Sequence, residues 1–291
     1  MQPANSPARS YAEAVERVRE LMARDDESIL PQARTALFEH GERRPLCVVL
    51  FHGFTNNPAQ YAQLAPLIHA RGVNVFVPRL PEHGDRNRMT KSIAKLTAET
   101  LLASAGDAVD IACGLGERVA VLGISLGGSL AAYFGQFREI ALAVPVAPEY
   151  ALLRLPYGVS HAIACAMLWL PNFFMWWDPR IREAQRPLTA YPRFSTHALM
   201  QTLRIGDDVY RAAPRSAPLA QRIVTVVNRA DPAVNNEASQ RVSSGWAQHG
   251  ADGIEYVELT DLPKNHDIID PDNPLARTDL VYPKLLDALG V

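Results

Sequence analysis

The residues Gly123-Ile124-Ser125-Leu126-Gly127 place a serine between two glycines. They directly follow an apolar run and directly precede a stretch with helical spacing. A G-x-S-x-G bend between a strand and a helix holds its serine on a tight turn, where the flanking positions must be small. A glycine-rich turn that only packs would show the same five letters. Strand, bend and helix occur together here, which favours Ser125 as a nucleophile that needs a base to remove its proton.

His266 is the histidine best placed to be that base. It follows the predicted strand 254–259 through a short loop, so it lies at the same sheet edge as a serine that follows a parallel strand. The alternative is an ordinary surface-loop histidine. Six of the other seven histidines fall in predicted helices, in a segment without strands, near the opposite edge, or in a loop where we interpret the ring as structural: His69, His249, His161, His197, His40 and His52.

Asp231 is the acid predicted to orient His266. It follows the strand 223–227 in a loop at the same edge, and serine, aspartate, histidine is one of the chain orders in which such triads occur. The alternative is a solvated turn residue before Pro232. Asp267 is a poor rival, because a side chain directly beside His266 does not readily orient that ring.

Two backbone amides are predicted to stabilise an oxyanion. Charge that develops on a substrate carbonyl must be met by fixed donors. The amide of Leu126, after the serine at a helix N-terminus, is one. The other is expected from the loop after strand 46–51, where Gly53 permits an unusual backbone conformation and Phe54 then offers its amide inward.

The elements that must position these residues alternate along the chain. Apolar runs predict strands at 46–51, 73–77, 119–124, 140–146, 223–227 and 254–259, and helical spacing predicts helices at 58–71, 92–113, 126–137, 235–249 and 274–289. This rhythm predicts an α/β fold with a mostly parallel sheet covered by helices on both faces. Residues 1–30 are predicted to be an N-terminal helical segment with an S-x-x-E capping box at Ser10 and Glu13. Residues 149–218 contain no strand-like run and are interpreted as an insertion into a core of residues 31–148 and 219–291.

Composition excludes several classes of protein. The 291 residues carry 29 basic and 31 acidic side chains, so there is no basic excess for nucleic acid. Three separated cysteines argue against a disulfide framework or a zinc site. The N-terminus does not resemble a secretory signal. The most apolar stretch, 162–177, is shorter than the roughly 18 residues of a membrane span. We expect a cytoplasmic protein without a metal or cofactor, and the sequence gives no indication of its oligomeric state.

Five motifs together resemble one protein family. The motifs are HGFTNNP after a strand, PRLPEHG after the next, GISLGG, DP and NH. In this order they are similar to the carboxylesterase and monoacylglycerol-lipase-like branch of the α/β-hydrolase superfamily. The resemblance runs from about Pro45 to the C-terminus and implies the fold, the triad, the two oxyanion amides and a cap formed by the insertion. The chain departs from the family at Glu82, where glycine is usual, which could affect the cap hinge or the pocket rim.

The resemblance implies a serine hydrolase that cleaves carboxylic esters through an acyl-enzyme, with short- to medium-chain or monoacylglycerol-like small molecules as substrates. A thioesterase, lipase, peptidase or acyltransferase would use the same triad, and a non-catalytic binding member of the fold is a further alternative. Epoxide hydrolases and dehalogenases carry aspartate where Ser125 stands. The wall of an acyl or aryl pocket is expected from cap aromatics, although these could instead form a small cap core or a membrane-docking patch: Trp169, Phe173, Phe174, Trp176 and Trp177.

Overall fold

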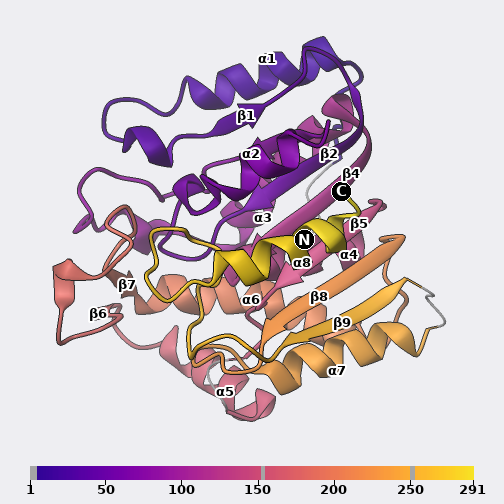
Figure 1. Cartoon of the computed structure of the whole chain (residues 1–291). Coiled ribbons are helices and arrows are strands. Elements are labelled where there is room, and N and C mark those ends of the chain that lie inside the picture. The colour runs from indigo at the N-terminus through magenta and orange to yellow at the C-terminus, as the bar shows by residue number, and fades with distance from the viewer. Residues whose placement is uncertain (1–4, 152–154, 250–252) are drawn as a thin grey trace.

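A seven-stranded sheet is the centre of the computed structural model, which describes residues 5–151, 155–249 and 253–291. The strand order is β1-β3-β2-β4-β5-β8-β9, and each neighbouring pair is parallel except β1 with β3 (Figure 1). This confirms the predicted α/β-hydrolase fold class. The strands are β1 (Ala36–Phe38), β2 (Arg44–Phe51), β3 (Asn74–Val77), β4 (Gly116–Ile124), β5 (Leu142–Val146), β8 (Arg222–Asn228) and β9 (Ile254–Leu259).

Helices cover both faces of this sheet. Figure 1 shows α2 and α8 in front of it and α3, α4 and α6 behind it. The α-helices of the described chain are α1 (Tyr11–Met22), α2 (Leu64–His69), α3 (Ala98–Leu115), α4 (Leu126–Phe137), α5 (Tyr157–Met167), α6 (Thr196–Ala212), α7 (Asn236–Ala247) and α8 (Thr278–Leu289). Among the described residues, none of the helices combines the length and the apolar character needed to cross a bilayer.

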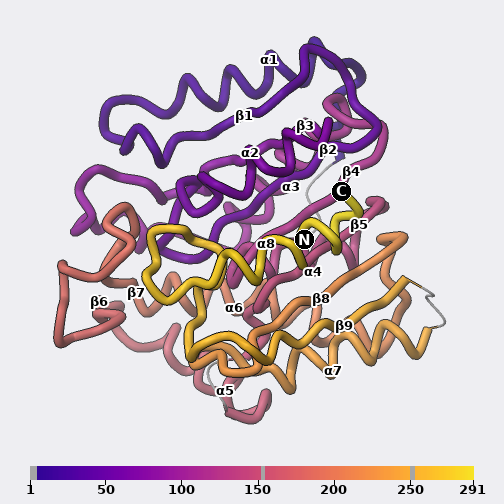
Figure 2. The backbone as a smooth tube through the Cα atoms, viewed as in Figure 1, coloured from indigo at the N-terminus to yellow at the C-terminus, as the bar shows by residue number. Residues whose placement is uncertain are grey.

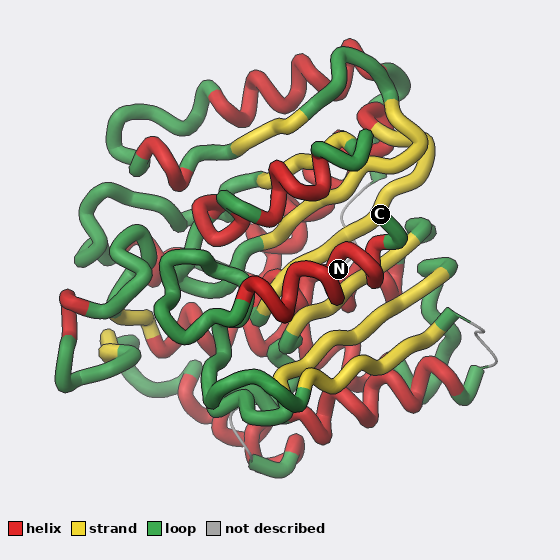
Figure 3. Tube along the Cα trace, in the orientation of Figure 1, coloured by secondary structure: helices red, strands yellow, loops and turns green. Residues whose placement is uncertain are grey.

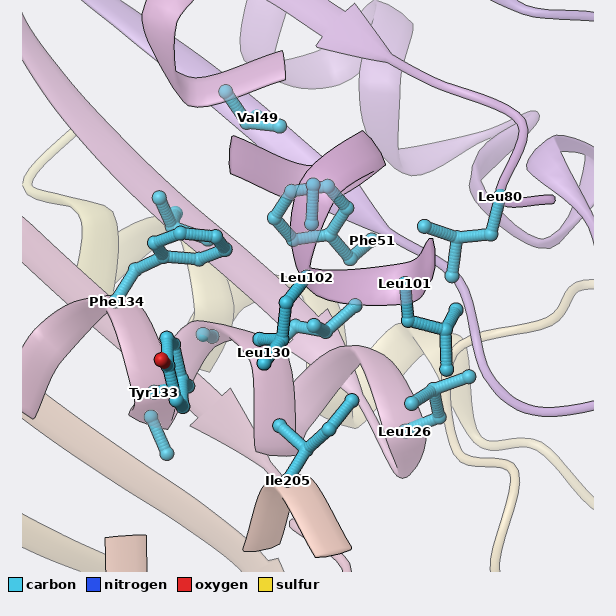
Figure 4. Packing of buried hydrophobic residues seen from close by; sticks show 14 of the residues in the cluster. Val49, Phe51, Leu80, Leu101, Leu102, Leu126, Leu130, Tyr133, Phe134 and Ile205 are labelled. Carbon is cyan, nitrogen blue, oxygen red and sulfur yellow. The ribbon is translucent and has the colours of Figure 1, made fainter. Parts of the chain in front are cut away.

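Successive side chains of β2 point to opposite faces of the sheet and pack in two separate apolar clusters, as expected for a strand buried on both faces. Phe51 packs in the cluster that includes α3, α4 and α6, whereas Leu50 packs with α2 and α8. Figure 4 shows Phe51 beside Leu102 of α3 and Phe134 of α4. Two well-filled layers therefore fix the strands that carry the candidate site residues.

Two predicted helices are each divided in the structure. The predicted helix 58–71 is a 3₁₀ turn at Pro58–Tyr61 followed by α2, which has Pro66 in its first turn, where a missing N–H is tolerated. The predicted helix 92–113 is a 3₁₀ turn at Ser92–Lys95 followed by α3. Helix α3 has its own N-terminal cap, because the Thr97 hydroxyl accepts the Thr100 N–H at 3.1 Å.

Three short strands differ from the prediction. Strand β1 adds an antiparallel edge strand, and β6 (Phe174–Trp176) pairs with β7 (Arg193–Ser195) inside the segment where no strand was expected. Each of these strands has three residues, too few for an alternating pattern to be recognised. Another difference lies at α1, where the Glu13 carboxylate accepts the Arg9 N–H, so the expected reciprocal capping box is only half formed.

The carboxyl ends of the parallel strands lie at one edge of the sheet. Figure 3 shows loops gathered beyond this edge, and Figure 2 shows the chain after β9 passing along it before entering α8. The β6–β7 pair lies beyond the same edge (Figure 1). This arrangement brings loops that are far apart in the sequence into one place.

Candidate active site

Ser125 occupies a strained bend between β4 and α4. Its backbone has φ 59° and ψ −117°, a conformation that residues other than glycine rarely adopt. The bend is tight on both sides: a methyl group at Gly123 would lie 2.2 Å from the Gly127 carbonyl oxygen, and one at Gly127 would lie 1.9 Å from that of Phe51. The two glycines are therefore required for the backbone to pass.

His266 and Asp231 are joined as the sequence predicts. His266 Nδ1 lies 2.8 Å from Asp231 Oδ2, and the Asp231 side chain is fully buried. The other carboxylate oxygen accepts the backbone N–H groups of Ala233 at 2.7 Å and Val234 at 3.3 Å. Burial alone would lower the pKa of His266, but the negative charge of Asp231, its hydrogen bond and the smaller effects of the Asp267 and Glu149 charges together raise this pKa.

Ser125 and His266 line one cavity of about 420 Å³. In the described part of the chain, no hydrogen bond joins the Ser125 hydroxyl to His266. Such contacts are often long without substrate and shorten in the complex. Among the described residues, the other His266 nitrogen, Nε2, has no hydrogen-bond partner, so in the neutral ring it is the nitrogen that can accept a proton.

The loop after β2 leaves one amide free beside the serine. The N–H groups of Gly53, Thr55, Asn56 and Asn57 donate to Gln60 Oε1, His83 Nε2, Gly53 O and Asn56 Oδ1. Within the described loop 53–57, only the Phe54 amide has no acceptor. A methyl group at Gly53 would lie 3.6 Å from Ser125 Cβ, so this loop passes close to the serine. Leu126 is the first residue of α4, where an N–H has no partner within the helix.

Two buried neutral histidines hold this loop in place. His52 Nε2 accepts the Leu80 N–H at 3.0 Å, and His83 Nε2 accepts the Thr55 N–H at 3.2 Å. Burial lowers the pKa of both, that of His83 to about 4. This agrees with the structural interpretation of His52. Glu82 takes part here through its backbone: its φ is 62° and its carbonyl oxygen accepts the Tyr191 hydroxyl. Glu82 is not among the residues that line the cavity.

One of the five predicted cap aromatics lines the cavity. Trp177 does so, and its indole N–H donates to Thr55 Oγ1 at 2.9 Å. Four others do not form the wall predicted for them: Trp169, Phe173, Phe174 and Trp176. Trp169 follows the end of α5 and is 91% exposed, and the ring of Phe174 is covered by the Arg193 guanidinium at 4.6 Å. Trp169 and Phe173 are exposed, whereas Phe174 and Trp176 are partly buried away from the cavity. The aromatic wall that this segment gives to the pocket consists of Trp177, Tyr191 and Phe194.

Three polar residues of the cavity were not predicted from the sequence. Asn56 and Gln60 donate to Asp267 Oδ2 at 3.1 and 2.8 Å, which ties the loop after β2 to the residue next to His266. Glu149 lines the same cavity as Ser125 and follows the carboxyl end of β5. The rule that selected Asp231 and His266, a polar side chain just beyond a parallel strand, applies equally to Glu149 and could have found it.

No metal site accompanies this arrangement in the described part of the chain, where no group of three or more histidine, cysteine, aspartate or glutamate side chains could hold an ion. The arrangement can supply a nucleophile, a base, an orienting acid and two oxyanion donors. These parts suffice for acyl transfer by side chains and backbone alone.

Comparisons with known proteins agree with the fold. A model of the alpha/beta hydrolase family matches residues 48–278. A thermostable monoacylglycerol lipase from Bacillus sp. (strain H-257) is 26% identical over 167 residues, which are 57% of this chain and 64% of that protein. The chain thus matches less than two thirds of the length of this curated relative.

Two solved structures extend the similarity over most of the chain. One was reported for LipS and LipT, two metagenome-derived lipolytic enzymes, with TM-score 0.67 and 21% identity over 89% of this chain and 98% of that one. The other is the monoacylglycerol lipase of Paleococcus ferrophilus, with TM-score 0.64 and 19% identity over 87% and 98%. At these identities the structures indicate a shared fold.

Proposed function

The chain belongs to the alpha/beta hydrolase family, and from that premise we propose that it is a serine hydrolase that cleaves carboxylic esters through an acyl-enzyme. One observation carries the proposal: the strained Ser125 bend opens onto the same cavity as His266, whose ring is joined to the buried Asp231. Strain at a serine is retained where surrounding structure holds it, and such positions cluster at sites of chemistry.

The proposed reaction uses each of these groups in turn. His266 Nε2 takes the Ser125 proton as Oγ attacks the ester carbonyl. Asp231 holds the other ring nitrogen and stabilises the imidazolium that forms. The amides of Phe54 and Leu126 receive the negative oxygen. The intermediate then collapses, the alcohol leaves with the proton from His266, and water releases the acid by the same steps.

We further propose short- to medium-chain or monoacylglycerol-like esters as substrates. The cavity is mostly apolar and its volume of about 420 Å³ lies in the range of small-molecule sites. The names of the similar proteins, which are monoacylglycerol lipases and lipolytic enzymes, also support ester substrates of this kind. Residues 149–218 are proposed as an insertion whose part around Trp177, Gln185 and Tyr191 caps the cavity that these residues line. Helix α6 of the same segment packs behind the sheet with α3 and α4.

The test is hydrolysis of p-nitrophenyl esters from acetate to palmitate by the wild type, Ser125→Ala and a matched control, Ser244→Ala, on the exposed face of α7. We expect turnover that is largest at short or medium chains, is lost in Ser125→Ala and is unchanged in Ser244→Ala. Equal turnover by Ser125→Ala and the wild type, or no turnover of any ester, would contradict the proposal.

A further inference from the structure

The Glu149 backbone is fixed between two helices. Its N–H donates to Ser129 Oγ of α4 at 2.9 Å, and its carbonyl oxygen accepts the same hydroxyl at 3.2 Å. Gly206 of α6 approaches so closely that a methyl group there would lie 2.1 Å from the Glu149 carbonyl oxygen. The side chain that leaves this fixed backbone lines the cavity with Ser125 and His266. Its position relative to the serine is therefore set by the fold.

The Glu149 carboxyl is buried and incompletely paired. The residue is 8% exposed, and Oε2 has no hydrogen-bond partner among the described residues. Burial raises its pKa to about 7, against smaller opposing effects of the Thr202 hydroxyl and the charge of His266. A buried carboxyl oxygen without a partner is unfavourable, and a native protein rarely retains one without a use.

The other buried polar side chains of the cavity are already paired. The Asp267 carboxylate accepts hydrogen bonds from Asn56, Gln60 and two backbone N–H groups. Side chains that donate or accept elsewhere within the described protein are Thr55, Asn56, Gln60, Arg88, Gln185 and Tyr191. Outside the proposed triad, Glu149 is thus the buried polar side chain in this described lining that still has an unpaired oxygen.

We propose that the Glu149 carboxyl is a specificity-determining group that pairs with a hydroxyl of the ester substrate. A hydroxyl can donate to a carboxylate and accept from a carboxylic acid, so it satisfies Oε2 in either protonation state. The inference rests on the proposed ester hydrolysis and adds a property of the substrate to it. The hydroxyl can belong to the alcohol, as in a polyol monoester, or to the acyl group, as in a hydroxyacyl ester.

Two matched ester pairs separate these sources. Glycerol monobutyrate is compared with propyl butyrate, and ethyl 3-hydroxybutyrate with ethyl butyrate. The readout is the ratio of kcat/KM for the hydroxylated ester to kcat/KM for its partner. The variants are Glu149→Leu, Glu149→Gln and the control Glu139→Leu, which removes an exposed carboxyl before the other end of β5.

We expect the wild type to favour the hydroxylated member of one pair by about tenfold or more, the effect of one buried hydrogen bond. Glu149→Leu should reduce that ratio by about the same factor. Glu149→Gln, which keeps the shape and hydrogen-bonding capacity, should retain most of the ratio, and Glu139→Leu should match the wild type. A ratio shift in the glycerol pair places the hydroxyl on the alcohol, and a shift in the other pair places it on the acyl group.

The proposal is overturned if the wild type shows no preference in either pair, or if Glu149→Leu keeps the wild-type ratios. If Glu149→Leu does not fold, Glu149→Met takes its place with the same outcomes, because it keeps side-chain length without the oxygens. Ser125-dependent hydrolysis with unaltered ratios removes only the role of Glu149. Absence of Ser125-dependent hydrolysis on all four esters removes the proposed function and this inference with it.

Discussion

Replacing Glu149 with glutamine should make the protein more stable at alkaline pH relative to the wild type. The pKa of Glu149 rises from its ordinary 4.5 to about 7 in the folded protein because the carboxyl is buried. Each tenfold change in an ionisation equilibrium corresponds to about 1.4 kcal/mol. Ionising this carboxyl in the folded state therefore removes roughly 3 kcal/mol of stability at a pH well above 7.

The direction follows from the raised pKa. The folded state binds the proton more tightly than the unfolded chain, so the stabilisation is complete below about pH 4.5 and is lost as the pH rises through about 7. Glutamine stays neutral throughout. The free energy of unfolding of Glu149→Gln minus that of the wild type should thus increase between pH 5 and pH 8.5, by up to about 3 kcal/mol.

Urea unfolding followed by circular dichroism at pH 5 and pH 8.5 measures this difference. Any constant effect of the substitution on packing cancels between the two pH values. Glu139→Gln is the control and should show the same difference at both, since its carboxyl is exposed. A Glu149→Gln difference that does not change with pH, or that changes in the opposite direction, would refute the reasoning.

Three further predictions concern the proposed catalytic groups. Asp231→Asn removes the carboxylate from His266 Nδ1 and should lower kcat/KM by about 10³–10⁴-fold in a folded protein, as seen in an ester assay with circular dichroism. Because the pKa of His266 is raised above 6.5 and only the neutral ring accepts the serine proton, kcat/KM should rise with pH with a midpoint above 6.5, and a lower midpoint would contradict this. Gly127→Ala should destabilise the fold by at least about 2 kcal/mol, because the methyl group would lie 1.9 Å from Phe51 O. Gly158→Ala, with nothing within 4 Å, is its control in thermal unfolding.

The residues that the sequence placed best all follow long parallel strands. The apolar runs before Ser125, Asp231 and His266 each predict a strand, and parallel strands present their following loops at one edge. Strand identity and edge were therefore enough to predict that these residues lie at one edge of the sheet. The structure places Ser125 and His266 on one cavity and joins Asp231 to His266. Their catalytic roles stay predictions that the experiments above address.

The parts that the sequence did not predict depend on contacts distant along the chain. Strands β6 and β7 have three residues each and form only because they pair with each other. The outward position of Trp169 depends on where α5 ends, which no local pattern marks. The unpaired oxygen of Glu149 is visible only after the partners of its neighbours are known. Pairing and burial of this kind are tertiary properties, beyond hydrophobic periodicity.

The most direct test of the central claim is labelling with a p-nitrophenyl alkylphosphonate followed by mass spectrometry of the intact and digested protein. An activated serine attacks phosphorus, p-nitrophenolate leaves, and one phosphonyl group remains on the serine oxygen. The account predicts one adduct per chain, on the peptide that contains Ser125, with labelling lost in Ser125→Ala and strongly slowed in His266→Ala. Labelling of Ser125→Ala at the wild-type rate, or an adduct on a different residue, would contradict the account.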